Sequence, residues 1–213
     1  KNFKERLKFL NNCKKFSNLT PVAFLRNTKN LKSEIDNIIK LKYRFVKIHP
    51  RKLKINYQNI KFYKKVFLKL KKKTNIIILW CTFDGWTNQA NELNQIEVLS
   101  KLINLAPKNK IILMHGGGPN LLKFYEKFKF LNNVYIDLSY TLLHYQKTSL
   151  EKDIIFLMRN FDKRLTIGSD FPEFKLNDLV KISKKYFIKS KISEIKRKNI
   201  FSNNLKKLIH EKL

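Results

Sequence analysis

Glycine, proline, tryptophan and cysteine are all scarce in this chain of 213 residues, which contains 5, 5, 2 and 2 of them. The cysteines, Cys13 and Cys81, are too far apart in sequence to form a paired metal motif, and they indicate a reducing compartment. Long apolar runs are also missing: none approaches the roughly 20 residues of a membrane span, and no signal segment opens the chain. We therefore predict a cytoplasmic protein that does not enter a membrane.

Acidic residues are few as well, 16 against 46 basic ones, which gives a net charge of +30. Such a field would attract nucleic acid or other anions. However, the basic residues are mostly lysine, whereas nucleic-acid surfaces rely more on arginine. They are also spread along the whole chain, in a composition typical of A/T-rich codons. We therefore expect a small-molecule substrate rather than nucleic acid as the partner, and leave the oligomeric state open, homo-oligomers included.

Two hydrophobic periods alternate along the chain. Short apolar runs occupy 21–25, 45–48, 75–80, 110–114, 133–138 and 164–167. Between them lie lysine-rich stretches with apolar residues at helical spacing, and helices are predicted over 1–16 and 58–72 among others. The continuous apolar strands indicate a parallel sheet covered on both faces, and therefore an α/β fold. Without a linker, repeat or Ser/Pro-rich tract, we expect one domain over 1–213.

The spacing of the strands suggests a particular α/β architecture. Most strand starts lie roughly 30 residues apart, close to the value for a (β/α)8 barrel of about 250 residues. A barrel needs eight strands and six are visible. Either the sheet is open and doubly wound, or two βα units precede Lys1. The second reading agrees with a chain that begins with lysine rather than methionine.

Polar side chains and glycines follow the predicted strands. They are His49-Pro50, Cys81-Thr82-Phe83-Asp84-Gly85-Trp86, His115 with Gly116, Gly117 and Gly118, then Asp137 and Ser139, and finally Gly168-Ser169-Asp170-Phe171-Pro172. The carboxyl ends of parallel strands share one rim, where the chemistry of such folds collects. The sequence therefore predicts an active site at this rim.

Several of these segments, in this order and spacing, resemble one known family. They are "VKIHP" at 46–50, "KIILMHGGG" at 110–118, "NVYIDLS" at 133–139, "IGSDFP" at 167–172 and "NIFSNNLKKLI" at 199–209. They look like the last six strands and closing helix of amidohydrolase-related proteins. Those proteins are metal-dependent (β/α)8 hydrolases, with decarboxylases and lactonases among them. The resemblance implies an incomplete barrel that lacks its first two strands.

The same resemblance implies roles for individual residues. His115 would orient or activate the attacking water or bind metal, and Asp170 would be a metal ligand and the general base. Gly116 and Gly117 would let the backbone approach the substrate closely and turn sharply into the next helix, which Pro119 can open. His49, Trp80 and His144 are further candidates for substrate contacts.

The sequence departs from the family pattern in two places. No His-x-His pair occurs, although the family's first strand carries one as two metal ligands. After the fifth strand, where the family commonly has a histidine, this chain has Trp80 or Cys81. Catalytic zinc typically takes three protein ligands. This chain offers at most His115 and Asp170 to zinc or manganese, so we do not expect it to bind the metal tightly. A longer protein would regain the ion through an upstream His-x-His pair together with Asp170, or Trp80 marks a lineage that dispenses with metal.

The predicted function is a hydrolase of the amidohydrolase type, or a related decarboxylase or lactonase, acting on a small anionic substrate. A positioned water would attack a carbonyl or ester carbon, and Asp170 would take its proton. Two alternatives remain open. One is a degenerate barrel without catalysis, which Trp80 favours. The other is a nucleic-acid-associated, metal-dependent nuclease, which the net charge favours.

Overall fold

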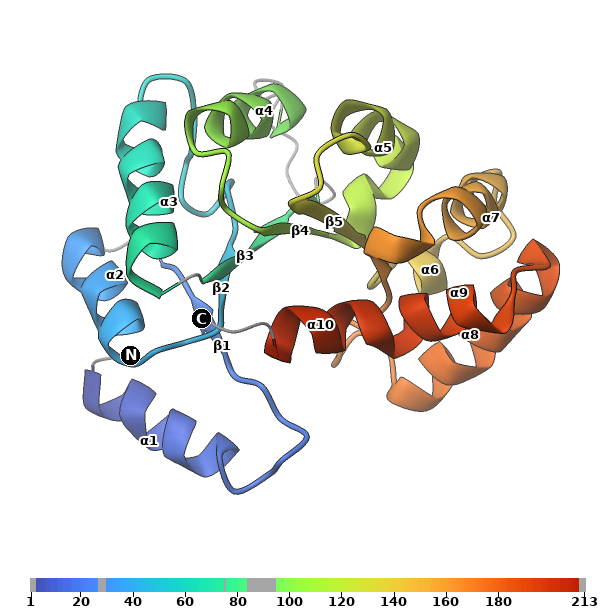
Figure 1. Cartoon of the computed structure of the whole chain (residues 1–213), viewed down its shortest axis with the longest axis horizontal. Helices are drawn as coiled ribbons and strands as arrows, with labels where there is room; N and C mark the ends of the chain where they lie inside the picture. The colour runs from blue at the N-terminus through green and yellow to red at the C-terminus, as the bar shows by residue number, and fades with distance from the viewer. Residues whose placement is uncertain (1–2, 27–29, 75, 84–94, 211–213) are drawn as a thin grey trace. The chain divides into compact units, whose positions relative to one another are not determined.

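The computed structural model describes residues 3–26, 30–74, 76–83 and 95–210 (Figure 1). Its strands are β1 Val22–Phe24, β2 Phe45–Ile48, β3 Ile77–Cys81, β4 Ile111–Met114, β5 Val134–Asp137 and β6 Leu165–Thr166. Its α-helices are α1 Phe3–Cys13, α2 Leu31–Lys40, α3 Ile60–Thr74, α4 Gln95–Leu105, α5 Leu121–Phe128, α6 Thr141–His144, α7 Leu150–Asn160, α8 Leu176–Ser190, α9 Glu194–Lys198 and α10 Asn204–His210. Every predicted strand is present within one or two residues of its expected bounds.

The strands form one sheet in the order β1-β2-β3-β4-β5-β6. The pairings of β1 with β2, β2 with β3, and β5 with β6 are parallel. A doubly wound sheet would reverse its strand order partway along, whereas this order follows the sequence throughout. The α/β prediction is therefore confirmed, and the arrangement is that of an incomplete (β/α)8 barrel.

The chain divides into two compact units. The first contains Lys1–Trp80 and Leu93–Ile111, and the second contains Cys81–Glu92 and Ile112–Lys212. That the chain acts as one domain over 1–213 stays a prediction. None of the described helices is both long and apolar enough to cross a membrane, and cytoplasmic location stays a prediction too.

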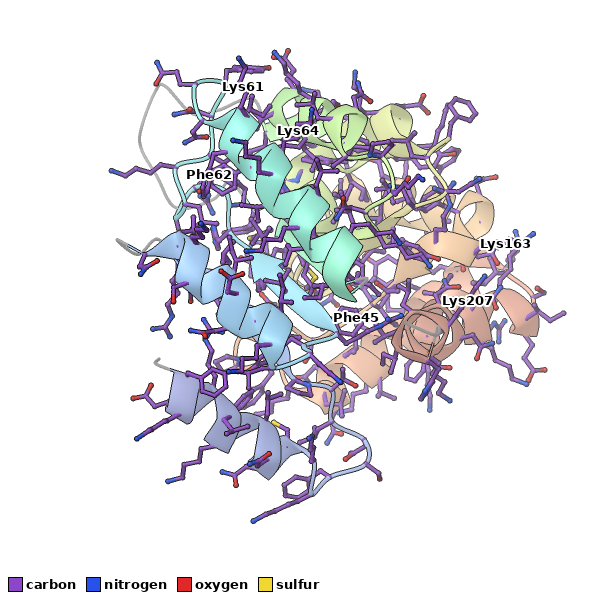
Figure 2. All side chains as sticks on the ribbon, turned by 60° about the vertical axis from the view of Figure 1, so that its left-hand side comes forward. Phe45, Lys61, Phe62, Lys64, Lys163 and Lys207 are labelled. Carbon is purple, nitrogen blue, oxygen red and sulfur yellow. The ribbon has the colours of Figure 1, made fainter. Side chains whose placement is uncertain are left out.

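In the first unit, α2 and α3 lie side by side next to the strands (Figure 1). The helical spacing noted in the sequence gives α3 its buried face, formed by Ile60, Tyr63, Phe67 and Leu70, each at most 4% exposed. Val66 is buried as well, whereas Lys61, Lys65 and Leu68 are exposed. Lys61, Phe62 and Lys64 project from α3 in Figure 2, while Phe45 at the start of β2 is buried. The exposed lysines of this helix, Lys61 and Lys65, therefore lie on its solvated side.

In the second unit, the buried Tyr186 of α8 should make the stability of the fold depend on pH. Burial, together with the nearby Glu151 carboxylate, strongly raises the pKa of its phenol. Between the ordinary tyrosine pKa of about 10 and the raised value, the unfolded chain releases this proton and the folded chain keeps it. Stability should therefore be full below about pH 10 and fall as the pH rises above it. In thermal melts at about pH 9 and about pH 11, Tyr186→Phe should lose less stability than the wild type; an equal loss would contradict this assignment.

Candidate active site at the ends of strands β4, β5 and β6

His115 follows β4 directly and begins a turn of unusual backbone. Its own φ is 67°, and Gly116, Gly117 and Gly118 follow with φ of 56°, 86° and 53°. L-residues rarely adopt such angles, and glycine does so at little cost. The predicted sharp turn into the next helix is therefore present, and α5 begins at Leu121.

The glycines of this turn lie against the protein itself. A Cβ on Gly117 would lie 2.2 Å from Cδ2 of Phe124 in α5. One on Gly116 would lie 2.9 Å from Leu121 and 3.2 Å from Leu138. Close packing of the turn on α5 and β5 thus gives these two glycines a reason beyond the substrate approach expected from the sequence. Their contact with a substrate stays a prediction.

Thr82, just beyond β3, fixes the glycine turn from the other side. Its hydroxyl donates to the Met114 carbonyl at 2.5 Å and accepts from the Gly117 N–H at 2.7 Å. The side chain is buried, with the residue 1% exposed. A single hydroxyl therefore uses both its donor and its acceptor capacity to hold the backbone on either side of His115.

The His115 imidazole is buried and directed at the end of β5. Nδ1 lies 3.2 Å from the Ser139 carbonyl oxygen and 3.4 Å from the Ser139 hydroxyl. Because a carbonyl oxygen can only accept, Nδ1 carries the proton in this hydrogen bond. In the neutral ring the lone pair is then on Nε2.

Asp170 follows β6, also on positive-φ backbone, with φ of 57°. Its Oδ2 lies 3.9 Å from His115 Nδ1. The two side chains differ in exposure, since that of Asp170 is 30% accessible and that of His115 only 5%. The structure therefore brings together the two residues proposed as catalytic, with the carboxylate on the solvent side.

A second carboxylate, Asp137 at the end of β5, is buried and internally satisfied. Its Oδ1 accepts from the Ser139 N–H at 2.9 Å, and its Oδ2 accepts from the Thr166 hydroxyl at 2.8 Å. Asp137 and Thr166 are paired in the register of β5 and β6. This carboxylate therefore ties the two strand ends together and holds the backbone that receives the His115 hydrogen bond.

Aromatic rings surround His115. Phe83 and Tyr140 contact its ring edge-on, with centroids 5.9 and 6.3 Å away. The Tyr140 ring stacks on His144 at 4.6 Å and lies 5.8 Å from Phe174. Burial, and then the nearby Tyr145, Glu173 and Asp170, raise the pKa of Tyr140. Its phenol therefore stays protonated through the neutral range.

The remaining predicted substrate residues divide between the two units. His144 ends α6 in the second unit, is exposed, and connects to His115 through the Tyr140 ring. Trp80 belongs to the first unit and is fully buried. Its ring lies edge-on to that of Phe67 in α3, with the ring centroids 6.1 Å apart. His49 follows β2 in the first unit, half-buried, with its carbonyl accepting from Leu53 N–H at 3.1 Å. The described contacts of Trp80 are thus packing contacts with a helix.

Sequence reasoning placed Thr82 and Phe83 at the predicted rim without giving either a role, and it missed Tyr140; Asp84, Gly85 and Trp86 of the same segment lie outside the described residues. Thr82 and Phe83 follow a predicted strand, which is the only signal that could have pointed to them. Tyr140 comes directly after the "NVYIDLS" segment and carries no motif of its own.

The donor set at this site does not fit a metal on the described residues. Within the described ranges no group of three His, Cys, Asp or Glu side chains converges. His115 and Asp170 approach one another, and Nδ1 of His115 is engaged by the Ser139 carbonyl. A catalytic zinc takes three protein ligands. The reaction proposed below therefore includes no step at a metal.

Comparison with solved structures supports the fold. An uncharacterized TIM-barrel protein from Bordetella bronchiseptica superposes with a TM-score of 0.75 at 15% identity, over 95% of this chain and 71% of that one. A probable 2-pyrone-4,6-dicarboxylic acid hydrolase from Acinetobacter baumannii, with citric acid bound, superposes with a TM-score of 0.56 at 15% identity, over 97% and 88%. No protein-family model and no curated protein sequence matches the chain. These neighbours show a TIM-barrel fold.

Proposed function

We propose that this chain carries the catalytic face of a hydrolase that opens an ester or lactone bond in a small, carboxylate-bearing substrate. One observation carries the proposal: a partly exposed carboxylate, Asp170, lies 3.9 Å from the buried imidazole of His115. Both stand on positive-φ backbone at the ends of strands. Such backbone is strained in residues other than glycine and clusters at functional sites.

The partly exposed Asp170 and the buried His115 suggest different roles in the reaction. Asp170 would accept a proton from the water that attacks the substrate carbonyl carbon. His115, which donates from Nδ1 to the Ser139 carbonyl and has that nitrogen 3.9 Å from Asp170 Oδ2, would favour the charged form of the carboxylate and hold it in place to meet the water. When the bond to the leaving alkoxide breaks, the protonated Asp170 returns its proton to that oxygen. The carboxylate is then ready for another cycle.

Two observations favour a substrate with carboxylates. The net charge of +30 gives the protein a field that attracts anions. The structurally similar Acinetobacter protein, a probable hydrolase of a dicarboxylic acid, holds citric acid in its crystal structure. A small anionic lactone or ester is therefore the first substrate class to test.

The test is a proton-release assay of the purified chain on lactones and esters that carry a free carboxylate. Each reaction is compared with the same chain carrying both His115→Asn and Asp170→Asn, and is repeated with a chelator. We expect at least one substrate to be hydrolysed by the wild type alone, with the chelator having no effect. Equal rates for both chains on every substrate would overturn the proposal and favour a barrel without catalysis.

A further inference from the structure

Tyr140 occupies the most unusual backbone position at this site. Its φ is 65° and its ψ is −57°. The Thr141 N–H donates to the Ser139 carbonyl at 2.7 Å, across a single intervening residue. These are the angles and the hydrogen bond of a γ-turn with positive φ, which is rare and strained. For a bulky residue such a position is unfavourable, so the surrounding structure must enforce it.

The γ-turn is enforced by the same contacts that hold His115. The Thr141 hydroxyl donates to the His115 carbonyl at 2.6 Å, and Asp137 accepts from the Ser139 N–H at 2.9 Å. The Ser139 carbonyl closes the turn and also accepts from His115 Nδ1. The strained turn and the imidazole are therefore parts of one hydrogen-bonded unit.

The turn places the Tyr140 ring between the catalytic candidates and the aromatic residues. The ring is 9% exposed, packs against Phe83 at 5.0 Å, and stands 85° to the plane of His115 at 6.3 Å. Among the residues that the structure describes, no hydrogen bond engages the Tyr140 hydroxyl. The Asp170 carboxylate is near enough to contribute to the raised pKa of this phenol. A protonated donor thus lies beside the His115–Asp170 pair.

Strained backbone recurs at each of the three strand ends that form the site. His115 after β4, Tyr140 after β5 and Asp170 after β6 all have positive φ, between 57° and 67°. Positive φ also occurs at Lys42, Lys54, Lys147 and Lys191, none of which lies within four residues of the end of β4, β5 or β6. The same structural device that presents the two proposed catalytic side chains also presents Tyr140.

We propose that Tyr140 is a third catalytic residue, whose phenol donates a hydrogen bond to the substrate carbonyl oxygen as that oxygen becomes negative. This inference rests on the hydrolase function proposed above. As the water oxygen bonds to the carbonyl carbon, the π electrons move onto the carbonyl oxygen. The phenol stabilises that charge without losing its own proton, and the water's proton goes to Asp170. When the carbonyl re-forms, the bond to the alkoxide breaks.

The test is Tyr140→Phe, which removes only the hydroxyl and keeps the ring contacts. We expect kcat to fall roughly 10²- to 10³-fold, as on loss of one donor to an oxyanion, with KM changing less than about threefold because the interaction belongs to the transition state. The melting temperature should stay unchanged, since the hydroxyl has no partner to lose among the described residues. Tyr125→Phe, a change at a buried tyrosine that contacts Phe156 and Phe161, should leave kcat unchanged.

The outcomes separate this inference from the proposed function. If the wild type hydrolyses a substrate and Asp170→Asn does not, yet Tyr140→Phe keeps the wild-type kcat, the role of Tyr140 is refuted and the hydrolase remains. A fall in kcat for Tyr140→Phe accompanied by an equal fall for Tyr125→Phe would also refute it. A wild type without activity on any substrate overturns both proposals together.

Discussion

Replacing Gly117 with alanine is expected to lower the free energy of unfolding by about 3 to 5 kcal/mol. Two separate effects add. The backbone at φ of 86° is unfavourable for any residue with a Cβ, and the new Cβ would lie 2.2 Å from the buried Phe124 ring. The ring is 1% exposed, so it has little room to move aside. Urea denaturation measures the loss, provided that the dependence of the unfolding free energy on urea concentration is the same for both proteins.

Gly118→Ala is a control that lacks the clash, at a backbone with ψ of −121° rather than the 2° of Gly117. Gly118 also has positive φ, but its Cβ would meet only Tyr145, at an ordinary 3.6 Å. It should therefore cost backbone strain alone, on the order of 1 to 3 kcal/mol. In a double-mutant cycle, Phe124→Leu should recover part of the Gly117→Ala loss by making space. Additive losses would show that the clash with Phe124 is not the cause.

Asp170→Asn is expected to lower kcat by roughly 10²- to 10⁴-fold, the range of a lost general base. The substitution isolates the charge. Asparagine is at least as tolerant of positive φ as aspartate, so the backbone at φ of 57° is retained. The amide cannot accept the water's proton. Steady-state hydrolysis of the substrate found in the screen, followed together with the melting temperature, measures the effect.

Two further variants test whether the fall in kcat for Asp170→Asn comes from the site itself. His115→Asn also suits its backbone φ of 67° and should lower kcat as well, because Asp170 loses the imidazole that lies 3.9 Å from its carboxylate. Asp178→Asn, on the exposed first turn of α8, removes the same charge away from the site and should leave kcat unchanged. A comparable fall in kcat for Asp178→Asn would mean that net charge, not proton transfer, governs the rate.

The fold could be predicted because its strands are continuous apolar runs bounded by polar residues. The run "FVKI" matches β2 residue for residue, and Ile60, Tyr63, Phe67 and Leu70 form the buried face of α3. Burial of apolar surface determines such elements locally, so the helical and strand periods of the apolar residues are enough to predict them. The meeting of His115 and Asp170 was also predictable, since both follow strands whose carboxyl ends share one rim.

Other features of the site could not be predicted, because they depend on tertiary contacts. Tyr140 adopts a γ-turn that no propensity favours, and only the hydrogen bonds around Ser139 and Thr141 enforce it. Thr82 is one threonine among several until its hydroxyl meets the Gly117 N–H. The alternation of side chains along β3 directs Trp80 toward α3. This direction could not be read from the sequence, because every residue of β3 is buried and both faces of the strand are apolar.

The Ser139 carbonyl gives the protein a built-in spectroscopic reporter. It accepts from both the Thr141 N–H and the imidazole Nδ1, so the two donors compete for one oxygen. When the ring ionises, the imidazole becomes the stronger donor, and the Thr141 amide proton must experience a weaker acceptor. The chemical shift of a single backbone amide would then follow the protonation of His115 through a titration, without a label on the histidine itself.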